Sequence, residues 1–423
     1  MRLYYREIRV RNAGMLNSHQ GPMIIISNHP NTMIDGWLIG KICKKQPFYL
    51  AKGTFFNKPW KKRVLMSLGM IPVNRQIDGQ TTGVNNGDSF EACYRVLEES
   101  KTLVIFPEGN SFQERGLREL KTGTARIALE VQQRNGGKLD LVIVPVGLFY
   151  TQAHRFRSSV LVNVGEPIRV DEYFEQYAIN SKLAAHGLTD EFRKKMEALL
   201  VLTSGTEREK LLEELIRILY NGDSDSVEQH AERLRTLDEI LANTQLTDPD
   251  RSLQIQNLIQ AYVSEKEQLS LRDEYIGKQG NRIRFLGKTA LSVLFLILGL
   301  PFFLFGFVHS IAPFRLTDFI VPRLTKAIEY YAPLAILLGL LLYPMNYVLF
   351  VGLVSSMVNL SIYEKALYFL AMPITGLYAF YYFHLMQAFF KRIRFLYRRN
   401  GHLAEIGLLK GIRMELLKLI EYN

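Results

Sequence analysis

The fold of this chain is decided by the stretch Met23-Ile24-Ile25-Ile26-Ser27-Asn28-His29-Pro30, which is followed five residues later by Asp35. A short apolar run that ends in polar residues predicts a buried strand over Met23–Ser27. Proline is favoured in the first turn of helices, so a helix is predicted to begin at Pro30. His29 then stands at the carboxyl end of a strand, where open parallel sheets form their sites.

The rest of residues 1–170 alternates between short strands and helices. Further strands are predicted over Pro47–Ala51, Met70–Val73, Thr102–Phe106, Leu141–Val146 and Ser158–Val164. Helices are predicted near Met33–Cys43, Val84–Ser100 and Leu120–Gln133. Such alternation is typical of an α/β domain whose sheet is mostly parallel and is flanked by helices.

Charge is distributed unevenly along the chain. The formal net charge is +11, yet residues 1–170 and 281–423 are basic while 171–280 are acidic. A nucleic-acid-binding protein does not normally place a long acidic block in its middle, and no aromatic stacking platform is evident. Basic segments beside apolar ones instead favour membrane lipids or a phosphate-bearing substrate as partners. The sequence makes no prediction of an oligomeric state.

The remainder of the chain is predicted to be helical. Residues 171–284 form an acidic helical insert, with apolar residues at helical spacing. Residues 285–314 and 332–390 contain three segments that are almost free of charge and exceed the roughly 20 residues needed to span a bilayer. Residues 391–423 form a basic amphipathic tail. We therefore expect a C-terminal all-α membrane region.

The topology of that region follows from its basic flanks. Three full spans would place Arg282 and Arg284 on the opposite side from the arginines after Lys391, which the positive-inside rule disfavours. Pro301 interrupts the first apolar segment, so 285–314 is predicted to be a re-entrant or broken hairpin. Ala332–Val358 and Ala366–Phe390 are then the two true spans.

The N-terminus and the cysteines indicate the compartment. The first residues carry arginines but no apolar core of a secretory signal, so we expect the catalytic part on the cytoplasmic side of an integral membrane protein. The two cysteines, Cys43 and Cys93, form no metal-binding pattern and are interpreted as ordinary thiols. No metal and no permanently bound cofactor is predicted.

His29 and Asp35 are candidates for acid–base chemistry. An imidazole has an ordinary pKa of about 6.5 and can act as a general base. A carboxylate within a turn or two can hold its tautomer and stabilise the imidazolium. Taken alone, the pair is better explained as a surface histidine at a helix cap and a solvated aspartate, and only the companion motifs favour catalysis.

Three more strand ends carry polar or glycine residues. The strand at Met70–Val73 leads to Arg75, whose guanidinium can bind a phosphate. The strand ending at Phe106 leads to Pro107-Glu108-Gly109, where a carboxylate and a glycine meet the sheet edge. The run Val144-Pro145-Val146-Gly147 is read as a core strand.

These four motifs, in this order, resemble the glycerolipid acyltransferase superfamily. Its blocks are Asn-His with a downstream Asp, an arginine, Phe-Pro-Glu-Gly, and a Val-Pro-Val-like strand. The five residues between His29 and Asp35, and the run His154-Arg155-Phe156-Arg157-Ser158, are similar to the fungal-type glycerol-3-phosphate/dihydroxyacetone-phosphate acyltransferase branch. One departure is that Asn110-Ser111-Phe112 stand where many relatives carry Thr or Ser and then Arg; the next basic residues are Arg115, Arg118 and Lys121.

The resemblance implies an O-acyltransferase that moves a fatty acyl group from acyl-CoA or acyl-ACP to glycerol 3-phosphate or dihydroxyacetone phosphate. His29 is the implied base and Asp35 orients it. Asn28, Arg75, Glu108 and Gly109 are the implied substrate-binding residues. Two alternatives stay open. One is an acyltransferase for 1-acylglycerol 3-phosphate or another lysophospholipid, and the other is a non-enzymatic membrane protein that binds lipid.

Overall fold

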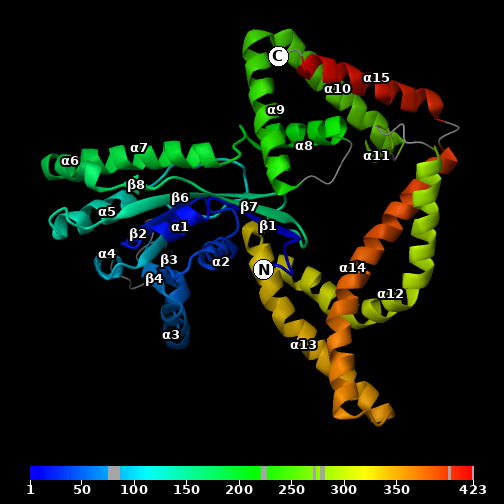
Figure 1. Cartoon of the computed structure of the whole chain (residues 1–423), viewed down its shortest axis with the longest axis horizontal. Coiled ribbons are helices and arrows are strands. Elements are labelled where there is room, and N and C mark those ends of the chain that lie inside the picture. The colour runs from blue at the N-terminus through cyan, green and yellow to red at the C-terminus, as the bar shows by residue number, and fades with distance from the viewer. Residues whose placement is uncertain (75–85, 221–225, 270–272, 277–281, 399–401, 422–423) are drawn as a thin grey trace. The chain divides into compact units, whose positions relative to one another are not determined.

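The computed structural model describes residues 1–74, 86–220, 226–269, 273–276, 282–398 and 402–421. These residues form two compact units (Figure 1). The first, called the α/β unit below, comprises Met1–Thr206, Asp225–Arg235 and Ala327–Pro333. The second, called the helical unit, comprises Glu207–Ser224, Thr236–Lys326 and Leu334–Asn423.

The α/β unit is built on one eight-stranded sheet in the order β1-β7-β6-β2-β5-β3-β4, with β8 paired to β6. The strands are β1 (Glu7–Arg11), β2 (Met23–Ser27), β3 (Phe48–Lys52), β4 (Met70–Val73), β5 (Thr102–Ile105), β6 (Val142–Tyr150), β7 (Ser159–Val164) and β8 (Ile168–Arg169). Every described strand pair is parallel except β6 with β7 and β6 with β8. The predicted, mostly parallel α/β fold is therefore confirmed.

Three helices cover one face of the sheet. They are α4 (Asn86–Glu98), α5 (Gly123–Arg134) and α7 (Ser181–Leu199). Their buried residues share a hydrophobic core with Ile24 and Ile26 of β2 and with Leu103 and Ile105 of β5. Because side chains alternate along a strand, Ile25 points to the opposite face, and it is also fully buried. A sheet covered on both faces explains the continuous apolar runs in its central strands.

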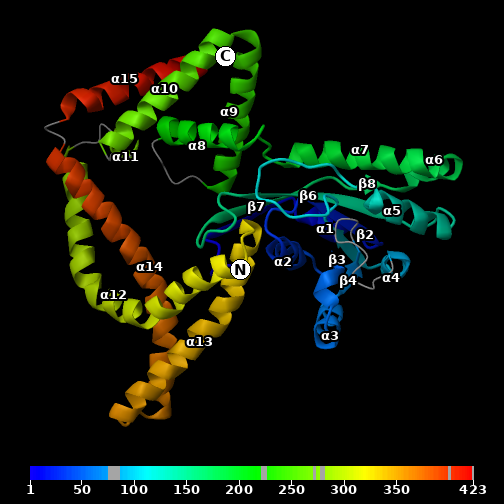
Figure 2. The same ribbon diagram turned by 180° about the vertical axis from the view of Figure 1, so that it is seen from behind.

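The opposite face carries the helix that follows the first strand motif. This helix, α2 (Met33–Ile42), lies with α1 (Gly14–Ser18) on the side of the sheet away from α7 in both views (Figures 1 and 2). Its residues Ile34, Leu38 and Ile39 are buried. The helix was predicted to begin at Pro30 and begins at Met33, because residues 28–32 form a turn.

The remaining elements of this unit are short. They are η1 (Gly53–Phe56), α3 (Pro59–Ser67), η3 (Asp171–Tyr173) and α6 (Phe174–Ile179). The unit extends beyond the expected domain boundary at residue 170. Ala184, Leu188 and Phe192 of α7 are fully buried in the same core as the strands, so this helix belongs to the α/β unit and not to the insert.

The helical unit contains the insert helices and the apolar helices. The insert forms α8 (Thr206–Tyr220), α9 (Val227–Thr247), α10 (Pro249–Gln268) and α11 (Asp273–Ile276), and the start of α9, up to Arg235, belongs to the α/β unit. The C-terminal region forms α12 (Arg282–Leu324), α13 (Tyr331–Met357), α14 (Ile362–Arg398) and α15 (Leu403–Glu421). Between α12 and α13, the short η4 (Ile328–Tyr330) belongs to the α/β unit. Three of the described helices are long and apolar enough to cross a membrane, over Ala290–Leu324, Ile328–Met357 and Ile362–Phe395. The predicted C-terminal all-α region is confirmed.

Helix α12 differs from the predicted hairpin. No turn interrupts 285–314, although Pro301, Pro313 and Pro322 lie within the helix, which bends along its length (Figure 1). Pro313 has no N–H to donate to the carbonyl of His309, four residues earlier. Asn346 of α13 supplies the missing donor, with its Nδ2 2.7 Å from that carbonyl oxygen. A side chain from a neighbouring helix thus satisfies the group that proline leaves free, and the helix continues.

Small and polar residues join α12 to α14. A Cβ on Gly306 would lie 2.0 Å from the carbonyl oxygen of Thr375, so only glycine allows this approach. His309 Nε2 lies 2.6 Å from the hydroxyl of Tyr368. Close backbone contact and hydrogen bonds across helices are typical of helix packing in membranes, where the hydrophobic effect contributes little.

Candidate active site

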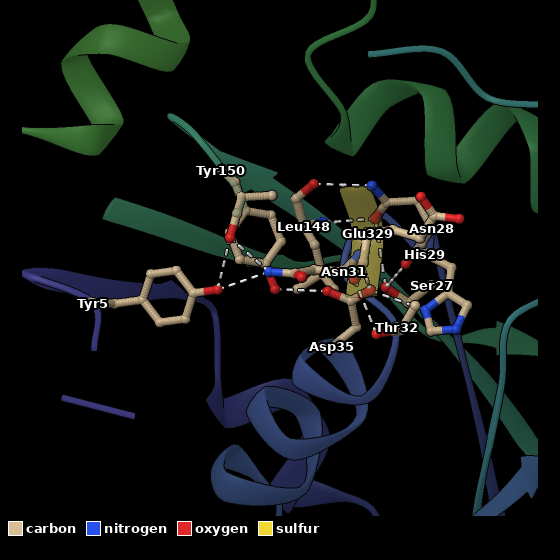
Figure 3. A network of polar contacts seen from close by, with 11 residues as sticks. Tyr5, Ser27, Asn28, His29, Asn31, Thr32, Asp35, Leu148, Tyr150 and Glu329 are labelled. Atoms are coloured by element: carbon tan, nitrogen blue, oxygen red, sulfur yellow. Dashed lines mark hydrogen bonds and ion pairs between the residues drawn. The ribbon is translucent and has the colours of Figure 1, made fainter. Parts of the chain in front are cut away.

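His29 and Asp35 form a direct hydrogen bond at the carboxyl end of β2. His29 Nδ1 lies 2.9 Å from Asp35 Oδ2 (Figure 3). The Asp35 side chain is fully buried and that of His29 is 17% exposed. Since a carboxylate only accepts, Nδ1 carries the proton and Nε2 keeps its lone pair. The arrangement can therefore take a proton from a group that approaches Nε2.

Two further donors hold Asp35. The backbone N–H of Asn31 donates to Oδ2 at 2.7 Å, and the hydroxyl of Tyr150 donates to Oδ1 at 2.6 Å (Figure 3). Burial, reinforced by the charge of Asp35, raises the pKa of Tyr150 well above its ordinary value, so the phenol stays protonated and remains a donor. Both carboxylate oxygens are thereby fixed, and with them the orientation of His29.

A second layer of buried polar groups supports this pair. Asn31 Nδ2 donates to the Tyr5 hydroxyl at 2.7 Å and to the carbonyl of Ala153 at 2.9 Å. The Tyr5 hydroxyl donates to the same carbonyl at 3.1 Å. These bonds tie the N-terminal segment and the loop after β6 to the turn that carries His29 (Figure 3). Buried hydrogen bonds of this kind restrain the geometry of the turn.

Tyr150 was not predicted as a site residue, because the apolar run was expected to end as a strand at Val146, before Gly147. In the structure β6 runs on to Tyr150. This position of the strand requires glycine, because a Cβ on residue 147 would lie only 2.8 Å from the carbonyl oxygen of Leu199. A glycine inside an apolar run often marks such a close approach. Reading the run through the glycine would have placed Tyr150 on the sheet.

Asn28 joins two strand ends. Its Nδ2 donates to the carbonyl of Leu148 at 2.9 Å, and its Oδ1 accepts from the N–H of Leu148 at 2.8 Å. The amide group is thus engaged with β6 backbone, in a pattern that holds the turn before His29 against the sheet. Its expected role in substrate binding stays a prediction, and its contacts here position the turn.

Thr32 connects the same turn to a distant part of the chain. Its φ of 42° lies in a region that non-glycine residues rarely adopt. Its hydroxyl donates to the carbonyl of Glu329 at 3.1 Å (Figure 3). Gln113 Nε2 donates to the carbonyl of Ile328 at 3.3 Å. The segment Ala327–Pro333 of the α/β unit therefore lies beside the His29 turn, a contact that local sequence patterns do not reveal.

Glu108 and Gly109 follow β5 at the same sheet edge. The ring of Phe106 stacks on His29, with centroids 3.7 Å apart and planes at 11°. Glu108 is 5% exposed, and its Oε2 accepts the N–H of Arg118 at 3.1 Å. Burial raises its pKa to about 7, against the opposing effect of the nearby amides of Arg118 and His29. Gly109 has a φ of +76°, which glycine adopts readily.

The structure brings together most of the predicted site residues. His29, Asp35, Glu108 and Gly109 meet at one edge of the sheet, and Asn28 holds the turn between them. Arg75 lies outside the described residues. Two cations that follow Gly109 lie near the Pro-Glu-Gly turn: the N–H of Lys121 donates to the carbonyl of Pro107 at 2.9 Å, and Arg118 bonds to Glu108.

The cysteines are poor nucleophiles. Burial raises the pKa of Cys43 to about 11 and that of Cys93 to about 12. The reactive form of cysteine is the thiolate, which these surroundings disfavour. No group of three or more His, Cys, Asp or Glu suited to a metal ion occurs in the part of the chain that the structure describes.

Comparison with known proteins identifies the α/β unit. Residues 7–148 match the family model described as Acyltransferase. The motifs at His29, Asp35 and Glu108 all lie within this range. This part of the chain is an acyltransferase-family domain, as the motifs predicted.

The names of curated relatives agree with this class. The chain is 34% identical over 95 residues to glycerol-3-phosphate O-acyltransferase 2 and 29% identical over 134 residues to glycerol-3-phosphate O-acyltransferase 1, both of Saccharomyces cerevisiae. The matches cover 22% and 31% of this chain and only 13% and 17% of those relatives. An uncharacterized acyltransferase of Schizosaccharomyces pombe is 34% identical over 98 residues, or 23% of this chain and 14% of that protein.

The structure of the 1-acyl-sn-glycerophosphate acyltransferase PlsC from Thermotoga maritima is also similar. It shares 15% identity, and the match covers 45% of this chain and 73% of that chain with a TM-score of 0.30. That score is too low to support a residue-by-residue correspondence.

Proposed function

We propose that this protein transfers a fatty acyl group from an acyl thioester to a hydroxyl of glycerol 3-phosphate or dihydroxyacetone phosphate. The observation that carries the proposal is the His29–Asp35 hydrogen bond, which leaves Nε2 of a partly exposed imidazole free to accept a proton. The names of the yeast relatives support the acceptor class. The donor is acyl-CoA or acyl-ACP, and no permanent cofactor takes part.

In the proposed reaction the acceptor hydroxyl oxygen attacks the thioester carbonyl carbon while its proton passes to His29 Nε2. The carbon–sulfur bond then breaks, and the thiolate leaves and takes up the proton from His29. A thiol has an ordinary pKa of about 8.5, so the leaving group needs little acid help. A well-placed general base contributes about 10²–10⁴-fold. Asp35 stabilises the imidazolium that forms between the two steps.

The other predicted residues would bind the acceptor. Glu108 presents Oε1, a buried oxygen for which the described residues provide no hydrogen-bond partner, and which a substrate hydroxyl would satisfy. Gly109 would let the ligand approach the backbone. Arg75 would bind the phosphate through its guanidinium, with Arg118 and Lys121 as further cations near the Pro-Glu-Gly turn.

The membrane placement is part of the proposal. Helices α13 and α14 would span the bilayer, and α12, as a bent continuous helix and not a hairpin, would enter and leave on the cytoplasmic side with the catalytic domain. The chain connectivity supports this, because Asp225–Arg235 before α12 and Ala327–Pro333 after it both belong to the α/β unit. A test is to label cysteines introduced at Arg315 and Ile362 from each side. Arg315 accessible from the outside would contradict the proposal.

The acceptor assay tests the function. The purified full chain is reconstituted in nanodiscs with labelled acyl-CoA or acyl-ACP, and each acceptor is supplied in turn: glycerol 3-phosphate, dihydroxyacetone phosphate or 1-acylglycerol 3-phosphate. We expect kcat/KM to be highest for one of the first two. Preference for the 1-acyl compound would instead identify the alternative, a lysophospholipid acyltransferase.

The His29→Ala variant tests the mechanism in the same assay. We expect transfer to be abolished while membrane insertion is retained. His186→Ala is the matched control, because this histidine is exposed on α7. Undiminished turnover by His29→Ala would reject the role of His29, and no transfer to any acceptor by the wild type would favour a non-enzymatic lipid-binding protein.

A further inference from the structure

Helix α3 has large apolar side chains that are exposed among the described residues. Trp60 is 63% exposed, Val64 50% and Met66 53%. None of the nine residues of α3, all of which the structure describes, is buried. Figures 1 and 2 both show α3 projecting from the end of the sheet that carries β3 and β4. A helix without buried residues gains little stability from packing, so its apolar residues call for another explanation.

The segment that contains α3 is strongly basic. Between Gly36 and Asn74 the chain has no Asp or Glu and eight basic residues, which are Lys41, Lys44, Lys45, Lys52, Lys58, Lys61, Lys62 and Arg63. Three of them are consecutive in the first half of α3, and its first turn has no acidic residue. Cations near a helix N-terminus oppose the helix dipole. Neither packing nor helix stability therefore accounts for this composition.

The helix lies next to the edge of the sheet that carries the site. It follows β3 through η1, as His29 follows β2 and Glu108 follows β5. Since β3 is parallel to β5 and β5 to β2, these three connections leave the sheet at the same edge. A surface that begins at this edge lies close to the place where a lipid substrate would have to approach His29 and Asp35.

We propose that α3, together with Phe55 of η1, is a docking surface for an anionic lipid bilayer. Tryptophan is favoured at membrane–water interfaces, and Val64, one helical turn later on the same face, would insert beside it. Lys61, Lys62 and Arg63 would contact the anionic headgroups through their long side chains. This contact is made by the α/β unit itself and is additional to the apolar helices. It holds whichever acceptor the enzyme uses.

The test follows Trp60 in the full chain. The protein contains two tryptophans, so Trp37→Phe leaves Trp60 as the only one. This variant is reconstituted in liposomes of phosphatidylcholine alone or mixed with phosphatidylserine, with brominated acyl chains as quenchers and without any acyl donor. We expect Trp60 to be quenched, and quenched more strongly in the anionic liposomes. Added salt should reduce the difference, because it screens surface charge.

Reversing the charges of α3 tests whether its cations contribute to membrane docking. Lys61→Glu, Lys62→Glu and Arg63→Glu together should lower the docked population by about tenfold or more, since each cation near an anionic surface contributes to binding. The matched control reverses Lys138, Lys182 and Lys194, three exposed cations elsewhere on the α/β unit. We expect the control to be quenched like the parent, with both variants keeping the parent's thermal midpoint.

Two results would overturn the proposal. One is a Trp60 that is quenched equally weakly in both lipid mixtures. The other is a reversal of α3 charges that raises only the KM for acyl-CoA and leaves quenching unchanged, which would assign the surface to the soluble donor. Should the triple variant fail to fold, the comparison of the two lipid mixtures with and without salt still decides the question.

Discussion

The hydroxyl of Tyr150 donates a 2.6 Å hydrogen bond to Oδ1 of Asp35 inside a fully buried site. Tyr150 ends β6 and Asp35 lies in the first turn of α2, so the bond joins the sheet to the helix that carries the carboxylate paired with His29. It is one of three bonds that fix Asp35, and the one made by a side chain outside the His29 motif.

Replacing Tyr150 by Phe should lower kcat with little change in KM. A hydrogen bond to a charged group contributes about 1.5–3 kcal/mol, which corresponds to about 10–100-fold in rate if it acts through His29. The pH profile of kcat should also shift, because without the Tyr150 hydroxyl the Asp35 carboxylate would stabilise the His29 imidazolium to a different extent. Tyr94→Phe, in the core on the other face of the sheet, is the control. A fall in stability with an unchanged pH profile would show a structural role only.

Asp35→Asn should lower kcat by about 10²–10⁴-fold. An amide that donates to His29 would favour the tautomer whose Nε2 carries the proton, and such an imidazole cannot act as a base. Acyl transfer by the purified variant measures the effect, and binding of a labelled acyl thioester checks that the site still forms. Wild-type turnover in Asp35→Asn would show that His29 works without this carboxylate.

Glu108 should make the stability of the chain depend on pH. Burial raises its pKa from 4.5 to about 7, so between these values the folded chain holds a proton that the unfolded chain releases. The stabilisation is therefore complete at acid pH and is lost as the pH rises through 7. At about 1.4 kcal/mol per pH unit the loss is on the order of 3 kcal/mol.

Glu108→Gln should remove that loss, because an amide stays neutral at every pH. The measurement is the thermal midpoint of each protein at pH 5 and pH 8. Glu114→Gln, whose side chain is 66% exposed, is the control and should behave like the wild type. Equal pH dependence in Glu108→Gln and the wild type would contradict the prediction.

Asn346→Ala should destabilise the helical unit, because it leaves the His309 carbonyl without the donor that replaces the N–H of Pro313. A buried group without a partner costs about 1–3 kcal/mol. Adding Pro313→Ala restores an N–H in the helix and should recover part of the loss. The thermal midpoints of the single and double variants give the coupling.

The control for this cycle pairs Asn346→Ala with Pro322→Ala, a proline of α12 whose missing N–H does not concern His309. The effects of these two substitutions on the thermal midpoint should be additive. Equal coupling in both cycles would show that Asn346 does not act through the carbonyl at His309.

Much of the architecture could be predicted from local patterns. The apolar run Met23–Ser27 forms a buried strand with the predicted bounds, and Met70–Val73 forms a partly buried strand, also with the predicted bounds. The bounds of a central strand can be predicted from the sequence, because a strand that is buried on both faces consists of consecutive apolar residues. The short first and last strands, β1 and β8, were not predicted, since Glu7–Arg11 alternates charge with apolar residues and Ile168–Arg169 is too short to show a pattern.

The sequence by itself determined the class of domain and the pairing of His29 with Asp35, because the two residues lie six positions apart and a strand followed by a helix must bring them close. It also determined the apolar helices, whose length and lack of charge are local properties. Only the tertiary structure decided what holds that pair. Tyr150, Tyr5 and Glu329 reach the His29 turn across long separations in the chain, and hydrogen bonds between distant residues leave no periodic trace in a sequence.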